Sequence, residues 1–199
     1  MRVAWIVVIA GCGFETRAST GVGEQSAPIP DAGVAAPSCP DSYGVQLPGS
    51  GSRYRLIPEG RPAWTQSDAC VADLPGATHL VVLESKAELD GATALVGAQT
   101  TALAGNAIWV GAVQQASATQ PAMGWLWLDG TAVTGWGGGE PNDRGGQENR
   151  EEQFARIEKG KLYLQDSAGN GNNSALCECD GKPIVAAAAT ALAAARPGS

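Results

Sequence analysis

Along the middle of the chain, the spacing of apolar residues alternates between the period of strands and the period of helices. In chain order, it predicts a strand at 54–57, a helix at 63–73, a buried strand at 80–83, a helix at 85–96 and a strand at 108–113. Ser85 and Glu88 have the spacing of a capping box at the start of the second helix. This half of the chain therefore predicts helices packed on strands.

The second half of the same region is rich in glycine and carries only short apolar runs. These runs predict strands at 125–127, 153–158, 162–165 and 175–178, and Gly160 predicts a hairpin turn at 159–161. Residues 135–147 have almost no regular pattern, and long irregular loops inside compact domains are usually functional. We expect one α+β domain at 39–180, with two helices, small antiparallel sheets and a long glycine-rich loop.

The two ends of the chain have a different composition. Residues 1–12 consist of a short basic segment followed by an apolar stretch that is too short to span a bilayer. This combination is typical of a signal peptide. Residues 13–38 predict a flexible linker, and residues 181–199, rich in alanine, predict a disordered tail. The protein is therefore expected to be exported.

The signal segment ends at Ile9-Ala10-Gly11-Cys12, which resembles the bacterial lipobox, in which the cysteine is lipidated. This resemblance implies a cell-envelope lipoprotein, tethered through Cys12 to the outer membrane or cell surface. The alternative is an ordinary signal peptide with a chance cysteine and a secreted product.

The net charge limits the possible partners of the protein, and the cysteine content limits its possible disulfides. The net charge of −7 argues against nucleic acid as a partner, because phosphates select basic surfaces. It fits either a solvated acidic surface or carboxylates that hold a hard cation such as calcium. With Cys12 lipidated, four cysteines remain, and export permits two disulfides in any of three pairings.

Residues able to bind a metal lie in and just after the irregular loop, and again at the end of the predicted hairpin that follows. Calcium takes six to eight oxygen ligands, and alternating acid and amide ligands can also bind the vicinal hydroxyls of a sugar. Three carboxylates and two amides are available for this purpose, at Glu140, Asn142, Glu148, Gln165 and Asp166.

The order of motifs along the chain resembles that of the C-type lectin-like domain family, over residues 39–180. The matching stretches are Trp-Thr-Gln-Ser-Asp-Ala-Cys at 64–70, Thr-His-Leu-Val at 78–81, Ile-Trp-Val-Gly at 108–111, Gly-Trp-Leu-Trp-Leu-Asp-Gly at 124–130, Gly-Glu-Pro-Asn at 139–142 after Trp136, and Ala-Leu-Cys-Glu at 175–178. No single motif decides the matter, but six in the right order form a strong signal.

This resemblance implies a calcium-dependent lectin that takes mannose-like sugars. Glu140 and Asn142 match the two ligands that flank a cis proline in the family. Glu148 stands six positions after Asn142, and Asp166 stands eleven before Cys177, as in family members. The resemblance therefore implies that Glu140, Asn142, Glu148, Gln165 and Asp166 bind one Ca²⁺, and that the first four also contact sugar.

Several positions depart from the family pattern. Gln165 replaces an asparagine ligand and is one methylene longer, and Leu164 replaces a tryptophan. Arg150 and Gly169 occupy the positions of the family's second disulfide. The loop at 112–124 lacks the carboxylates that give some members a second calcium, although Asp143 fits one auxiliary ligand, so one calcium is expected.

The resemblance also implies a disulfide pairing. Cys70 and Cys177 match the family's core bridge, and long-form members carry an N-terminal hairpin closed by a bridge of its own. Cys39 would begin that hairpin, but no cysteine follows it before Cys70, so Cys179 is its remaining partner. We therefore expect Cys70–Cys177 and Cys39–Cys179.

Catalysis is not expected. His79 is the sole histidine, and a histidine beside a core strand with no matched nucleophile is usually structural. Most of the tryptophans are expected in the core rather than stacked on sugar. Many proteins with this fold bind proteins through the same loop without calcium, so a protein-binding or adhesion module is the alternative function.

Overall fold

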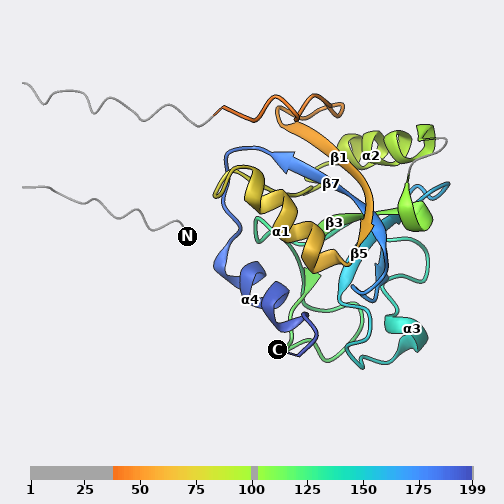
Figure 1. The fold of residues 1–199 in the computed structure, drawn as a ribbon. Coiled ribbons are helices and arrows are strands. Elements are labelled where there is room, and N and C mark those ends of the chain that lie inside the picture. The colour runs from red at the N-terminus through yellow and green to blue at the C-terminus, as the bar shows by residue number, and fades with distance from the viewer. Residues whose placement is uncertain (1–37, 100–102, 199) are drawn as a thin grey trace, which may run out of the picture. The chain divides into compact units, whose positions relative to one another are not determined.

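The computed structural model describes residues 38–99 and 103–198, and the predictions for Cys12, the signal segment and the linker up to residue 37 lie outside these ranges. The described chain forms helices packed on one sheet (Figure 1). The strands are β1 (Arg53–Arg61), β2 (Thr78–Leu80), β3 (Ala107–Gln114), β4 (Trp125–Trp127), β5 (Phe154–Glu158), β6 (Gln165–Ser167) and β7 (Asn173–Cys179). The helices are α1 (Ala63–Asp73), α2 (Lys86–Ala98), the single-turn α3 (Asp143–Gly146) and α4 (Ala186–Ala194), and a 3₁₀ turn spans Ala104–Asn106.

β7 and β3 form the centre of the sheet, whose order is β1-β7-β3-β5-β6, with β2 also paired to β7 and β4 to β3. Every residue of β3 and β7 is buried, as expected for strands that are covered on both faces. The sheet differs in one detail from the small antiparallel sheets expected. β3 and β7 run parallel, with Ile108 opposite Ser174 and Trp109 opposite Ala175, and this pair joins the two halves into one sheet.

Two predicted strands are displaced along the chain. The apolar run at 80–83 lies mostly after β2, but it is still held to the sheet, because Val81 N–H donates to Leu176 O at 2.8 Å. Leu164 is not part of β6, because it exchanges hydrogen bonds with the long loop, at Gly135 O and Gly137 N–H. The predicted strand at 162–165 is therefore partly an anchor for the loop.

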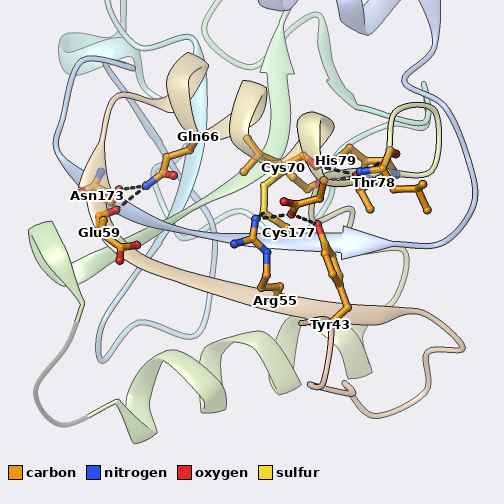
Figure 2. Close-up of a disulfide and its surroundings, with 12 residues drawn as sticks. Tyr43, Arg55, Glu59, Gln66, Cys70, Thr78, His79, Asn173 and Cys177 are labelled. Atoms are coloured by element: carbon orange, nitrogen blue, oxygen red, sulfur yellow. Dashed lines mark hydrogen bonds and ion pairs between the residues drawn. A yellow bond between two sulfur atoms is a disulfide. The ribbon is translucent and has the colours of Figure 1, made fainter. Parts of the chain in front are cut away.

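The first two helices begin where the sequence predicts. Ser85 Oγ accepts the Glu88 N–H at 3.2 Å and Glu88 Oε2 accepts the Ser85 N–H at 3.0 Å, which confirms the capping box of α2. In α1, Gln66 is fully buried and its amide donates to the backbone of Glu59 and Asn173, tying β1 to β7 (Figure 2). β1 and β7 lie between α1 and α2 (Figures 1 and 2).

The alanine-rich C-terminal segment is ordered, which corrects the expectation of a disordered tail. Val185 N–H donates to Leu128 O at 2.9 Å, and α4 then packs against β3 with Ala188, Ala191 and Leu192 buried. Alanine has a high helix propensity, and its small side chain lets a helix approach the sheet closely. The domain therefore extends beyond residue 180.

Both predicted disulfides are confirmed, and both end on β7. The Cα atoms are 5.4 Å apart in Cys70–Cys177 and 5.9 Å apart in Cys39–Cys179. The first bridge joins α1 to β7 beside Arg55, which pairs with the Asp73 carboxylate (Figure 2). The second ties the start of the domain to the end of β7.

Removing the core bridge is expected to destabilise the protein more than removing the edge bridge. The two close loops of 107 and 140 residues, a difference worth only about 0.2 kcal/mol in chain entropy. Cys70 and Cys177 are fully buried, so Cys70→Ala with Cys177→Ala also leaves a cavity in the core. We expect a loss of about 2–4 kcal/mol for Cys39→Ala with Cys179→Ala, and about 1–2 kcal/mol more for the core pair, in urea unfolding. An equal or larger loss for the edge pair would contradict this.

His79 has a structural setting at the end of the sheet. Its ring is buried, with Nδ1 2.8 Å from Leu80 O and Nε2 3.2 Å from Asp180 Oδ1. Both nitrogens lie beside acceptors, an arrangement that favours the protonated ring, in which both nitrogens donate. Burial by itself lowers the pKa of His79, but these two hydrogen bonds and the charges of Asp180 and Glu178 outweigh it and raise that pKa.

This pair predicts a pH dependence of stability. The His79 contribution is complete below its ordinary pKa of 6.5 and is lost as pH rises through the raised folded value. The pKa of Asp180 is lowered, mainly by the hydrogen bonds from His79 and Lys182 against its burial, so its contribution is lost only in acid, below 3.8. We expect this pair to lower the unfolding free energy by about 1.5–3 kcal/mol as pH rises above 6.5, in addition to the loss that Glu140 and Glu152 cause from lower pH. Asp180→Asn should flatten this slope in urea unfolding from pH 5 to 9, and an unchanged slope would exclude the pair as its source.

Candidate functional site

The candidate site lies in the long segment between β4 and β5, which is fixed at its base by backbone pairing and aromatic packing. Trp136 bridges to Leu164, and its ring packs edge-on against Trp125 with centroids 4.8 Å apart. A side chain at Gly137 would meet the Tyr163 ring, because an added Cβ would lie only 2.3 Å from it. The position of the base of the loop, at Trp136 and Gly137, is therefore fixed relative to the sheet.

Glu140 and Asn142 meet at the tip of this loop. The Glu140–Pro141 peptide bond is cis, as the resemblance implied. Asn142 Nδ2 donates to Glu140 Oε2, so the amide and the carboxylate lie side by side. Both residues are half-buried.

Asp166, from β6, joins them from the other side. Its Oδ2 accepts the backbone N–H of Asn142 at 2.9 Å and of Asp143 at 2.7 Å. Its Oδ1 is buried without a hydrogen-bond partner among the described residues, and so is Oε1 of the adjacent Gln165. Buried acceptors in proteins almost always have a partner. The free Asp166 oxygen, close to the Glu140 carboxylate, is a position that would accept a positively charged group.

The electrostatics of the cluster agree with this conclusion. Partial burial, together with the neighbouring Asp166 and Glu152 carboxylates, raises the pKa of Glu140 to about 7. Burial and the charge of Asp166 also raise the pKa of Glu152. Carboxylates in such close company are unfavourable unless a proton or a cation lies among them.

Asp143 organises the return of the loop to β5. Its buried carboxylate accepts the backbone N–H groups of four consecutive residues, from Asn149 to Glu152. Asp143 also has a positive φ of 44°, a conformation that aspartate tolerates better than most residues. It acts in this structure as a support for the loop, rather than as the auxiliary ligand that its position suggested.

Glu148 is held apart from the other predicted ligands. Its Oε2 accepts from Gln114 Nε2 at 2.7 Å and its Oε1 accepts from Arg150 N–H at 3.0 Å. Within residues 38–99 and 103–198, no three His, Cys, Asp or Glu side chains are grouped so that they could hold a metal. Glu140, Glu148 and Asp166 would form such a group if they converged. The structure therefore brings Glu140, Asn142 and Asp166 together, leaves the adjacent Gln165 oxygen unpartnered, and places Glu148 on Gln114.

The donor set fits calcium. The cluster offers two carboxylates, at Glu140 and Asp166, and the amide of Asn142, with Gln165 next to Asp166 in the chain, and calcium prefers oxygen ligands of these kinds. Within the part of the chain that the structure describes, Asp166 Oδ1 and Gln165 Oε1 have no hydrogen-bond partner. Rotation of the Asn142 side-chain amide would exchange its nitrogen and oxygen and so place the oxygen beside Glu140.

Sequence reasoning missed two residues here, Gln114 and Glu152. Gln114 is the one polar side chain in β3, whose residues are all buried, and a buried polar side chain at a strand end was the available signal. Glu152 gave no signal, because only the folded loop brings it close to Asp166.

Neither a protein-family model nor a curated protein matches the sequence of the chain. Solved structures match its fold. The C-type lectin CEL-I from Cucumaria echinata is 19% identical, with a TM-score of 0.57 over 73% of this chain and 100% of its own. The mouse scavenger receptor C-type lectin carbohydrate-recognition domain is 20% identical, with a TM-score of 0.54 over 74% and 99%. The Ca²⁺-independent C-type lectin SPL-2 from Saxidomus purpuratus is 22% identical, with a TM-score of 0.55 over 71% and 94%.

The described domain therefore has the C-type lectin fold, and the predicted α+β class is confirmed. Its two disulfides are typical of domains that fold in an oxidising, extracytoplasmic compartment. None of the helices in the described ranges has the length and hydropathy needed to cross a bilayer.

Proposed function

We propose that the protein is an exported, non-catalytic lectin that binds carbohydrate through one calcium ion. The observation that carries this proposal is the buried Asp166 Oδ1, which has no hydrogen-bond partner among the described residues and belongs to the carboxylate that holds the backbone of Asn142, beside Glu140. A cation would satisfy this oxygen, and buried polar atoms in proteins almost always have a partner.

In this proposal, Glu140, Asn142, Gln165 and Asp166 hold the ion, and Glu148 joins them if its carboxylate turns away from Gln114. Bound calcium supplies open positions that the vicinal hydroxyls of a sugar can fill. Glu140 accepts a hydrogen bond from one sugar hydroxyl, and the neighbouring Asn142 donates a hydrogen bond to the oxygen of that hydroxyl. The Glu-Pro-Asn order resembles members of the lectin family that take mannose-like sugars.

A second candidate function is calcium-independent binding of a protein partner through the same loop. It is favoured by the hydrogen bond from Asn142 to Glu140, which lets two proposed ligands satisfy each other without an ion. SPL-2, a Ca²⁺-independent C-type lectin, has the same fold.

The remaining parts of the proposal concern location and chemistry. We propose a lipid anchor on Cys12, which would tether the lectin to a cell envelope through a linker. Catalysis is not proposed, because His79 is engaged by Leu80 and Asp180 within the sheet.

Calorimetric titration with calcium, followed by binding to a glycan array with and without a chelator, separates the two functions. The lectin proposal expects one calcium per chain and chelator-sensitive binding to mannose-like sugars. No calcium uptake at millimolar concentration would overturn it and favour the protein-binding module. Metabolic labelling with a fatty acid, compared between the full chain and Cys12→Ser, tests the anchor, and label retained by the variant would exclude it.

A further inference from the structure

A pocket of about 390 Å³, here called the α4 pocket, lies between the start of α1, the segment before β5, the turn from β6 to β7 and the end of α4. This volume is within the range of about 300–1,000 Å³ that is usual for small-ligand sites. α4 lies beside α1 (Figure 1), and Arg196, just after α4, pairs with the Asp68 carboxylate of α1 at 2.5 and 3.1 Å. The wall formed by residues 194–197 is therefore fastened to the domain.

Two aromatic side chains, Trp64 and Phe154, line the α4 pocket. Their ring centroids are 6.1 Å apart at an angle of 57°. Both rings lie against the backbone of Gly169, where an added Cβ would be 2.4 Å from Phe154 and 3.0 Å from Trp64. Trp64 is only half-buried, and its Nε1 has no hydrogen-bond partner in the described part of the chain. An indole held in this way offers a ligand both an apolar face and a donor.

Gln153 lines the same pocket and supplies a polar group beside the rings. Its backbone is fixed, because its carbonyl accepts the Gln114 N–H at 3.1 Å. The residue is 8% exposed, yet neither end of its side-chain amide is hydrogen-bonded within the residues that the structure describes. Buried amides in proteins almost always have a partner. The oxygen and the NH₂ group of this side chain are therefore available to a ligand, as an acceptor and a donor.

Arg150 and Glu151 add opposite charges to the α4 pocket. The Arg150 N–H donates to Asp143 Oδ2 and to Glu148 Oε1, each at 3.0 Å, so its main chain is fixed. Neither the Arg150 guanidinium nor the Glu151 carboxylate has a hydrogen-bond or ion-pair partner among the described residues. A charged ligand would be attracted by one of them and repelled by the other. Hydroxyl groups suit both, because a hydroxyl donates and accepts.

We propose that the α4 pocket is a second carbohydrate site, which binds an uncharged pyranose ring without calcium. The C–H face of the ring lies on Trp64, the Gln153 amide bonds to a hydroxyl group, and Arg150 and Glu151 bind further hydroxyls. A pyranose whose substituents are all equatorial, such as a β-glucoside, has the flat C–H face that this contact requires. The site goes beyond the proposed calcium site and does not rest on it, because none of the proposed calcium ligands of the cluster lines the pocket.

The test uses methyl β-glucoside, titrated by calorimetry into the full chain after calcium has been removed. Gln153→Leu keeps the approximate size of the side chain and removes its amide. This amide bonds to nothing in the described structure, so the melting temperature should stay the same or rise. The affinity for the glucoside should fall about 10-fold, as expected for the loss of a hydrogen bond or two. A glutamine with a merely structural role would give a loss of stability instead.

Gln147→Leu is the matched control, because Gln147 is exposed on the same loop and lies outside the α4 pocket. It should keep wild-type affinity for the glucoside. The inference is overturned if calcium-free wild type does not bind methyl β-glucoside at tens of millimolar, if Gln153→Leu binds it as tightly as wild type, or if Gln147→Leu weakens binding equally. The proposed function fails separately: wild type would then take up no calcium and would still bind the glucoside.

Discussion

Replacing Glu140 with Gln is expected to abolish calcium-dependent sugar binding while the fold stays intact. The substitution removes one of the two carboxylates in the cluster and keeps the shape of the side chain. Calcium affinity depends steeply on the number of charged ligands, so we expect a loss of about 100-fold or more. Binding to immobilised mannose-like sugar should fall to the level seen with chelator.

The same variant should behave in the opposite way without calcium. Glu140 is partly desolvated beside the Asp166 and Glu152 carboxylates, so removal of its charge relieves repulsion. The calcium-free melting temperature is therefore expected to stay the same or rise. In wild type, calcium at about 100 times its dissociation constant should add about 2.7 kcal/mol of stability, and this gain should disappear in the variant.

Glu151→Gln provides the control for Glu140→Gln. Glu151 is exposed on the same loop, so its replacement changes the net charge equally without touching the cluster. Calcium affinity, sugar binding and calcium-dependent melting should all match wild type. If Glu140→Gln retained full sugar binding, the cluster would not be the sugar site.

The elements that the sequence predicted well are those determined by local patterns. The helix α1 and the capping box of Ser85 and Glu88 follow from residues within one or two turns. The turn around Gly160 likewise follows from a single residue with a positive φ of 82°. The two disulfides were predictable because the resemblance assigned one pair and left only Cys39 and Cys179 for the other.

What the sequence could not predict depends on contacts between distant segments. Ala188 and Ala191 of α4 are buried because α4 packs against β3, a contact between distant segments that composition does not reveal, so composition alone suggested a tail. The strand at 162–165 was misplaced because Leu164 pairs with the long loop rather than with β5.

The candidate site was predicted in part for the same reason. The Glu140–Asn142 pair and Asp166 meet as the motif order implied. Glu148 does not join them in this structure, because its carboxylate is held by Gln114, 34 residues away in the chain. No short motif encodes that contact.

Replacing Asp143 with Asn is expected to loosen the whole loop and weaken calcium binding without removing any proposed ligand. The amide nitrogen of asparagine cannot accept hydrogen bonds, so two of the four backbone N–H groups now bound would lose their partner. Hydrogen bonds to charged groups are worth about 1.5–3 kcal/mol each, which predicts a loss of stability on the order of 3 kcal/mol.

Calcium affinity should fall about 10–100-fold in Asp143→Asn, which is the usual effect of losing a residue that supports metal ligands. The backbone N–H of Asp143 donates to Asp166, so a shifted loop would also move that ligand. Asp129→Asn is the control, because Asp129 makes a similar but exposed turn with Thr131 outside the loop, and it should have little effect. Urea unfolding and calcium calorimetry measure both quantities. If Asp143→Asn kept wild-type calcium affinity, the site would not depend on the order of the loop, because this substitution disturbs that order while leaving every oxygen of the cluster in the chain.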